Sequence, residues 1–429
     1  MKKALVLAGG GTRGIYQVGA IEALKEAGLD DWNIITGTSV GALNAALLVQ
    51  GDFDKVIEMY ENLRPEQIVN GFPDLDNLTI TNVLKDYDTL IPTIKSWVKD
   101  KGVDIEPFMN LLDEYYDEER FLASPIDFGC ITSKAKGHEG VYVTKDMMKG
   151  KGKDWLLASS AAYPIFPQKT IDGEEYVDGG YYDNLPIDFA LRLGAEEIIA
   201  IDLLPHPQHP MYLGREHITY VYPRVPLYVF LEFDPKKMQK ARLLGYYDMQ
   251  KKLGIKNGEK FTFEAFDDPS YFDDLYRSIM MLETKIRLVT PISERFRSEQ
   301  LVTDTIKKQL GVDSLTPRQY LYGMLDSLLE ICGEEDVTKL YTYKEARGII
   351  LAKFADAANV DYKMIPVDIE NLTVDVSSVN HAGFISYFIH SNLYPEIDKQ
   401  LYDMNLVVNG YDKALADLVT YMMKELGDE

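Results

Sequence analysis

Residues 34–46 read I-I-T-G-T-S-V-G-A-L-N-A-A, and this stretch decides the fold. β-Branched residues close a short apolar segment, the pentapeptide G-T-S-V-G follows, and a run of small helix-forming residues comes next. The pattern predicts a strand, a sharp turn and a helix, with Ser39 at the apex of the turn. Gly37 and Gly41 flank the turn, and we expect that a Cβ at either position would collide with the neighbouring strand or helix.

The residue at the apex is a candidate nucleophile. A side chain on such a turn points into solvent at the N-terminus of a helix, where backbone N–H groups and the helix dipole favour developing negative charge. A G-x-S-x-G pentapeptide is also common as an ordinary Gly-Ser turn. The assignment of Ser39 therefore depends on what the rest of the chain supplies.

The composition is that of an acidic globular protein. The chain has 429 residues, of which 46% are hydrophobic and 26% charged, and its net charge is −23 at pH 7. This length predicts two or three domains. The acidic balance argues against a nucleic-acid partner and against firm electrostatic docking on anionic membranes. No apolar run has the length of a membrane span, and the two cysteines, Cys130 and Cys332, lie far apart, so we expect a cytoplasmic protein.

The segments that precede Ser39 predict an α/β fold. Residues 3–8 are almost wholly apolar, as in a buried parallel strand, and residues 15–27 have the spacing of an amphipathic helix. A second strand, over residues 32–36, leads into the Ser39 turn. The alternation of strand and helix predicts a parallel sheet with helices on its faces.

The glycine-rich loop at residues 9–14, G-G-G-T-R-G, has two interpretations. Successive glycines between a strand and a helix expose backbone N–H groups, which makes them candidate donors to an oxyanion. The same spacing, G-x-G-x-x-G, occurs in dinucleotide-binding folds, which also need an acidic residue at the end of the second strand. That strand ends instead in T-G-T-S, so the sequence disfavours a nucleotide site.

The catalytic base is the next requirement. Asp178 follows an apolar strand and precedes two glycines that leave its carboxylate accessible, although an Asp-Gly bend is also common as a plain turn. The six histidines lie in less suitable settings, namely a hairpin tip, a proline-rich loop, a strand start and an apolar-aromatic stretch: His138, His206, His209, His217, His381 and His390.

Together, residues 9–14, residues 37–41 and the triplet Asp178-Gly179-Gly180 resemble the patatin-like phospholipase family in order and spacing. Residues 158–167 and 181–186 resemble the family's segments on either side of its aspartate, and the resemblance covers about residues 3–252. It implies an α/β fold, a three-layer modified α/β-hydrolase sheet, and a Ser–Asp dyad that needs no catalytic histidine, metal or cofactor.

The resemblance also implies roles for individual residues. Ser39 would be the nucleophile and Asp178 the base that takes its proton. Arg13 could support the glycine-rich loop or meet a lipid phosphate. The oxyanion hole and substrate-binding loop would comprise Gly9, Gly10, Gly11, Thr12, Arg13 and Gly14, and the supporting turn residues would be Gly37, Gly41, Gly179 and Gly180.

These expectations define a domain plan and a function. An acyl hydrolase domain spans residues 1–255, with helices within 52–122 that cover the sheet or cap the site, and a mainly helical C-terminal region spans 256–429. The predicted function is serine hydrolysis of ester bonds in phospholipids or related acyl lipids through an acyl-enzyme, with at most transient membrane contact. The alternative is a regulated effector or interaction module whose C-terminal region binds a partner. The sequence does not predict the oligomeric state.

Overall fold

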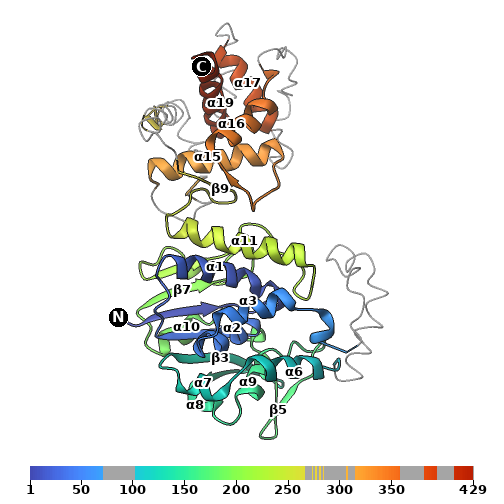
Figure 1. Cartoon of the computed structure of the whole chain (residues 1–429). Helices are drawn as coiled ribbons and strands as arrows, with labels where there is room; N and C mark the ends of the chain where they lie inside the picture. Colours follow the sequence, from blue (N-terminus) through green and yellow to red (C-terminus); the bar gives the residue numbers. More distant parts are fainter. Residues whose placement is uncertain are drawn as a thin grey trace. The chain divides into compact units, whose positions relative to one another are not determined.

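The computed structural model describes residues 1–70, 102–265, 315–357, 381–393 and 410–428, together with isolated positions between 273 and 307. The chain divides into two compact units, Met1–Leu253 and Gly254–Glu429 (Figure 1). We describe each unit by itself. The helix expected over residues 84–98, and most of those expected over 273–288 and 299–310, lie outside the described residues.

The first unit contains a mixed eight-stranded sheet of order β5-β6-β3-β2-β1-β7-β8, with β4 paired to the other side of β3. The central strands β3, β2, β1, β7 and β8 are parallel, whereas β4 and β6 run antiparallel to β3. The α/β prediction is therefore confirmed. The strands are β1 (Lys3–Leu7), β2 (Ile34–Thr38), β3 (Asp127–Lys134), β4 (Gly140–Thr144), β5 (Lys169–Ile171), β6 (Glu174–Asp178), β7 (Glu197–Ile201) and β8 (Ile218–Val221).

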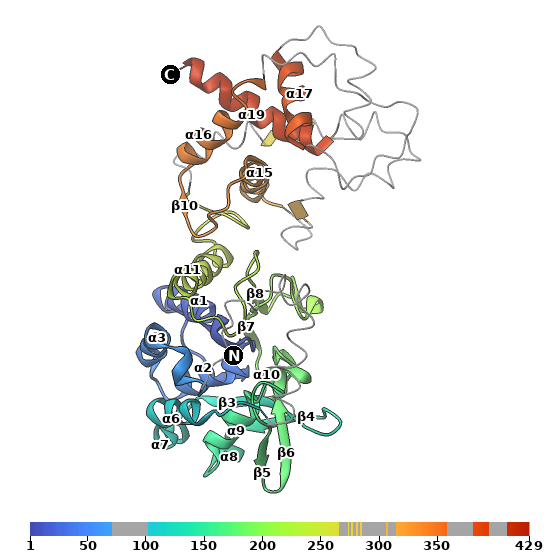
Figure 2. The same cartoon turned by 90° about the vertical axis from the view of Figure 1, so that its right-hand side faces the viewer.

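Helices lie on both faces of this sheet (Figure 2). Gly37 faces α2, whose backbone would meet a Cβ at that position, whereas the hydroxyl of its neighbour Thr36 donates to the carbonyl of Pro186 just before α10. Successive strand residues point to opposite faces, so α2 and α10 cover opposite sides. The helices of this unit are α1 (Ile15–Glu26), α2 (Val40–Val49), α3 (Phe53–Asn62), α6 (Glu106–Tyr115), α7 (Glu118–Ala123), α8 (Lys145–Met148), α9 (Gly152–Ser159), α10 (Ile187–Arg192) and α11 (Pro235–Lys252).

The second strand differs from its prediction by two residues. The sequence favours residues 32–36, whereas β2 runs from Ile34 to Thr38 and ends directly before Ser39. Pairing with both neighbours extends the strand, since Gly37 lies opposite Leu7 of β1 and Thr38 opposite Ile131 of β3. Sheet pairing thus overrides the weak strand propensity of glycine.

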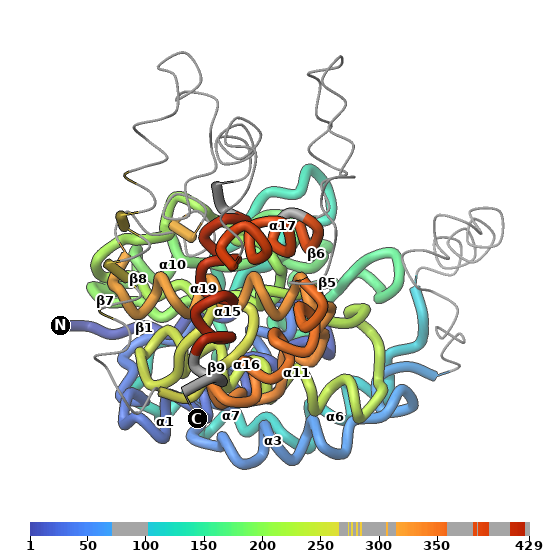
Figure 3. Tube along the Cα trace, turned by 90° about the horizontal axis from the view of Figure 1, so that it is seen from above, coloured from blue at the N-terminus to red at the C-terminus, as the bar shows by residue number. Residues whose placement is uncertain are grey.

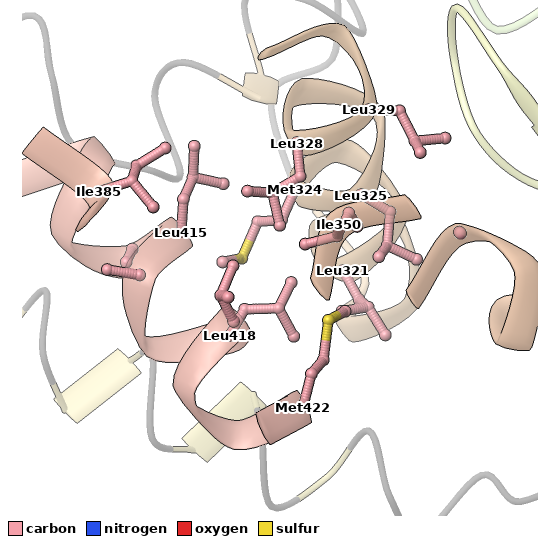
Figure 4. Close-up of a cluster of buried hydrophobic side chains, with 14 of the residues drawn as sticks. Leu321, Met324, Leu325, Leu328, Leu329, Ile350, Ile385, Leu415, Leu418 and Met422 are labelled. Carbon is pink, nitrogen blue, oxygen red and sulfur yellow. The ribbon is translucent and has the colours of Figure 1, made fainter. Parts of the chain in front are cut away.

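The second unit is mainly helical, as predicted. Leucine, isoleucine and methionine side chains of four helices contribute to its core (Figure 4), together with aromatic residues such as Phe261 and Tyr341. His381 lies with its Nδ1 2.9 Å from Oδ1 of the buried Asp412, so it joins two of these helices. The elements are α15 (Pro317–Cys332), α16 (Tyr343–Lys353), α17 (His381–Leu393), α19 (Gly410–Asp428) and the short parallel strands β9 (Thr262–Phe263) and β10 (Leu340–Tyr341), of which α17 and the two strands were not predicted. Among the helices described in both units, none is long and apolar enough to cross a bilayer.

Candidate active site

Ser39 occupies a strained turn between β2 and α2. Its backbone has φ 54° and ψ −126°, a combination that side chains other than glycine rarely adopt outside functional sites. A Cβ on Gly37 would lie 2.3 Å from the carbonyl oxygen of Gly41, and one on Gly41 would lie 2.3 Å from that of Leu7. The predicted close approach at both glycines is confirmed, and it forces the helix tightly against the ends of two strands.

A second serine, Ser159, hydrogen-bonds to the backbone of the turn. The Ser39 N–H donates to Oγ of Ser159 at 3.0 Å, and that hydroxyl donates to the carbonyl of Ile131 at 2.7 Å. Ser159 is fully buried at the end of α9. These bonds tie the turn to the neighbouring strand β3, so the position of Ser39 is fixed by the core.

Sheet register brings Asp178 beside this turn. Thr38 pairs with Ile131 of β3, and the next residue of that strand, Thr132, pairs with Asp178 at the end of β6. The Asp178 carboxylate accepts a hydrogen bond of 2.7 Å from the N–H of Gly180, and the side chain of Ser39 is close enough to lower the pKa of this carboxyl group. The two residues that the sequence singles out therefore lie together in one cavity.

Burial changes the acidity of this carboxyl group. Asp178 is only 8% exposed, and burial raises its pKa to about 6, although the bond from Gly180 and the nearby side chain of Ser39 act in the opposite direction. An aspartate in water has a pKa of about 3.9. The carboxylate is thus still ionised at neutral pH, but it is a considerably stronger base than an exposed aspartate.

The glycine-rich loop follows β1 and lies beside the turn. The N–H of Gly9 donates to the carbonyl of Asn184 at 3.0 Å, and the N–H of Thr12 donates to the carbonyl of Phe230 at 2.8 Å. The N–H groups of Gly9 and Thr12 are therefore already hydrogen-bonded within the protein and are not available to an oxyanion. In the described part of the chain, the N–H groups of Gly10 and Gly11 have no acceptor.

Two side chains fix the orientation of those free N–H groups. Asn184 donates from Nδ2 to the carbonyl of Gly9 at 3.1 Å, and Arg13 donates from Nε to the carbonyl of Gly10 at 3.0 Å. The C=O and N–H of a trans peptide point in opposite directions. Holding these carbonyls therefore turns the N–H of Gly10 and that of Gly11 away from Asn184 and Arg13.

A cavity of about 320 Å³ opens onto these groups. Its polar end contains residues 9–13, Ser39 and Asp178, while its wall is apolar. Half of the apolar wall residues come from α2, α3 and α6, of which α3 and α6 are labelled at the lower edge of Figure 3. Among the described residues that line it, the only charged side chains are Arg13 and Asp178, and there is no histidine. The apolar wall comprises Val40, Leu43, Met59, Leu63, Ile68, Phe108, Leu111, Phe166, Phe230, Leu231 and Phe233, together with the ring of Tyr60.

One wall of this cavity was not predicted. The segment 230–233 lines it, and Tyr228 just upstream donates to the carbonyl of Thr12 at 2.8 Å. Residues 225–233 read V-P-L-Y-V-F-L-E-F, an apolar and aromatic run that forms no regular element. Such a run has to be buried against something, and that is the signal that could have identified it.

His209 contacts the loop that follows Asp178. Nε2 of His209 lies 3.1 Å from Oδ1 of Asp183, and this contact raises the pKa of His209. The adjacent Gln208 accepts a bond of 3.1 Å from Asn184 and donates one of 2.6 Å to the buried Asp202. This loop thus positions Asn184. In the described ranges, no group of three or more His, Cys, Asp or Glu side chains could hold a metal ion.

Comparison with known proteins identifies a family match for the part of the chain that carries these residues. The model of the patatin-like phospholipase family matches residues 5–191. This part of the chain is a patatin-like phospholipase domain. A lysophospholipase nte1 of Aspergillus terreus is 30% identical over 204 residues, which are 46% of this chain and 12% of that protein. The mouse patatin-like phospholipase domain-containing protein 7 is 30% identical over 200 residues, 47% of this chain and 13% of that protein.

The chain therefore spans only about an eighth of the length of these curated relatives. Among solved structures, VipD from Legionella pneumophila is similar with a TM-score of 0.38 and 15% identity, over 83% of this chain and 86% of that one.

Proposed function

We propose that the patatin-like domain is a serine acyl hydrolase that cleaves carboxylic esters of phospholipids, lysophospholipids or related acyl lipids. The observation that carries the proposal is that sheet register brings Ser39 and the buried Asp178 together in one cavity. Ser39 stands on a strained turn, the base is buried, and two unoccupied N–H groups share one apolar cavity with them. The family match over residues 5–191 supports the same class of reaction.

The first half of the reaction forms an acyl-enzyme. Oγ of Ser39 attacks the ester carbonyl while Asp178 takes the hydroxyl proton, and the N–H groups of Gly10 and Gly11 stabilise the negative oxygen of the tetrahedral intermediate. The intermediate then breaks its bond to the alcohol, which leaves with the proton from Asp178. The acyl group remains on Ser39.

The second half releases the acid. Asp178 takes a proton from a water molecule, which attacks the acyl carbonyl, and the proton returns to Oγ of Ser39 as the fatty acid leaves. The raised pKa of Asp178, about 6, suits both transfers, because proton exchange is most effective when the pKa of the base lies near the working pH.

The lining favours an acyl chain as the part of the substrate that is bound. Apart from the catalytic end, the wall is aliphatic and aromatic. Binding of a hydrocarbon chain there is favourable, because it removes apolar surface from water. Arg13 is bound through Nε to the loop that carries the N–H donors. We therefore assign it to support of the loop rather than to recognition of a phosphate.

Substitution of the nucleophile tests the proposal. Ser39→Ala should abolish release of fatty acid from lysophospholipid or diacyl phospholipid, and also labelling by a serine-directed phosphonate. Ser124→Ala is a matched control, because Ser124 lies outside the cavity and its hydroxyl accepts only a local bond from the N–H of Ile126. Wild-type esterase activity in Ser39→Ala would overturn the assignment.

A second candidate function concerns the C-terminal unit, which is compact by itself and has its own core. It could bind a protein partner or control access to the site. A chain ended after Leu253 tests this role. Unchanged ester hydrolysis, oligomeric state and expression would dismiss it, whereas a change in turnover with intact folding of the first unit would support it.

A further inference from the structure

A second cavity lies against the active-site cavity. It has a volume of about 210 Å³. Three residues, Phe108, Ser160 and Phe166, line both cavities. The remaining lining residues of the second cavity are Ile105, Met109, Leu157, Ala161, Pro167, Gln168 and Lys169. The two spaces are therefore separated by very few side chains.

Two aromatic rings form most of the partition. Phe108 lies on α6 and Phe166 lies between α9 and β5, and their ring centroids are 6.2 Å apart with an interplanar angle of 31°. Both side chains are almost completely buried. Phe108 lies on a helix and Phe166 on a connecting segment, so neither ring belongs to a strand of the sheet that carries the dyad.

The chemistry of the second cavity suits the end of a hydrocarbon chain. Its wall is mostly aliphatic and aromatic, with Ser160 and Gln168 as the uncharged polar residues, and its charged residue, Lys169, is paired with Asp154 at 2.6 Å. A ligand that enters from the Ser39 side has its ester carbonyl at the N–H groups of the glycine-rich loop, so the part that passes the two rings is the tail of the acyl chain.

We propose that the second cavity is a subsite for the distal part of a long acyl chain, and that the Phe108–Phe166 pair determines which chain lengths reach it. The inference rests on the proposed acyl hydrolase function and adds a substrate preference to it. Short acyl groups fill only the first cavity. Long acyl groups displace the ring partition and bury additional methylene groups beyond it.

Two substitutions with opposite expected effects test the subsite. Phe108→Ala removes half of the partition and should raise the ratio of kcat/KM for palmitoyl over butyryl p-nitrophenyl esters by about fourfold or more, the gain from one additional buried methylene. Met109→Trp should reverse that gain in the Phe108→Ala protein. Met109 lines only the second cavity and is 43% exposed, so a larger side chain can enter the cavity there without disturbing the core.

Leu112→Ala is the matched control. Leu112 lies on the same helix as Phe108 and is similarly buried, but it lines neither cavity. Its loss should change the rates for all chain lengths by the same factor. Equal changes for all chain lengths in Phe108→Ala, or a gain that survives Met109→Trp, would overturn the subsite.

A binding measurement separates this inference from the function on which it rests. In the Ser39→Ala background, palmitate should bind more tightly to the Phe108→Ala protein and more weakly once Met109→Trp is added, while octanoate affinity changes little. That order of affinities without any ester hydrolysis by wild type would leave the subsite standing and remove the hydrolase function. Ester hydrolysis by wild type without that order of affinities would keep the hydrolase function and overturn the subsite.

Discussion

Ser39 and Asp178 come together along one edge of β3, where the ends of β2 and β6 meet, while β4 occupies the opposite edge. The register of both strands on that edge places the two residues, since Thr38 pairs with Ile131 and Asp178 pairs with Thr132. A slip of one residue in either pairing would turn a side chain to the opposite face of the sheet. The proposed dyad is therefore a property of the whole central sheet rather than of its two loops.

The first prediction concerns the pH dependence of hydrolysis. The proposed base must be ionised to accept a proton, and burial raises the pKa of Asp178 to about 6. We expect kcat/KM for an uncharged ester to be low in acid and to rise with pH through about 6, because kcat/KM reports the ionisation of the free enzyme. An activity that is already constant above about pH 5 would place the base at the pKa of an exposed aspartate and contradict the assignment.

The same carboxyl group should lower the stability of the fold at neutral pH. A folded-state pKa above the unfolded value means that the folded chain binds the proton more tightly, so the destabilisation is absent at low pH and complete above about 6. Asp178→Asn should therefore increase the free energy of unfolding by about 2 kcal/mol at neutral pH while abolishing turnover.

Urea unfolding of the Asp178→Asn protein, at neutral pH and again near pH 5, measures this effect. The gain in stability should shrink at the lower pH, where part of the wild-type Asp178 population is already protonated. Asp146→Asn is the matched control, since Asp146 is exposed and lies outside the cavity. A gain of the same size at both pH values would contradict the electrostatic explanation.

Asn184 should act as a positioning residue for the oxyanion donors. Its side chain holds the carbonyl of Gly9 and thereby directs the N–H of Gly10. Asn184→Ala should reduce kcat by about tenfold to a hundredfold with little change in KM, since direct loss of an oxyanion donor costs about a hundredfold or more. Asn184→Asp keeps the size of the side chain but cannot donate when ionised, so it should be impaired at least as strongly. Full activity in Asn184→Asp would show that only packing matters at this position.

The residues of the site fall into those that local sequence predicts and those that it does not. Ser39 was found because a sharp strand-to-helix turn needs glycines at fixed offsets, which is a steric rule that five residues express. Asn184, Ser159 and the segment 230–233 act through contacts with elements remote in sequence. No periodicity or spacing encodes such contacts, because they depend on how strands and loops pair in the folded chain.

The same distinction explains the fold-level errors. Strand β1 was predicted within one residue at each end, because an almost wholly apolar run marks it, whereas β5 is three residues long and was missed. α17 was also missed, since its sequence is apolar on nearly all sides and shows no alternation of polar and apolar faces. A helix of that kind is recognised only by the core that surrounds it.

The last prediction concerns two glycine substitutions that should change the stability of the protein in opposite directions. A Cβ at Gly41 would lie 2.3 Å from the carbonyl oxygen of Leu7 and 2.6 Å from that of Ala8, both backbone atoms that cannot move aside. Gly41→Ala should therefore destabilise the first unit by about 3 kcal/mol and distort the Ser39 turn. Gly348 lies in the exposed interior of α16, and a Cβ there meets no atom within 4 Å, so Gly348→Ala should stabilise its helix by about 0.5–1 kcal/mol.

Thermal unfolding followed by circular dichroism, together with ester hydrolysis, distinguishes these effects. Gly41→Ala should lose activity and unfold at lower temperature, whereas Gly348→Ala should keep its activity and unfold no earlier than wild type. If Gly41→Ala were as stable and as active as wild type, α2 would not be held against the ends of β1 and β2. The strained conformation of Ser39 would then have no steric cause, because the close contact at Gly41 is what forces the turn.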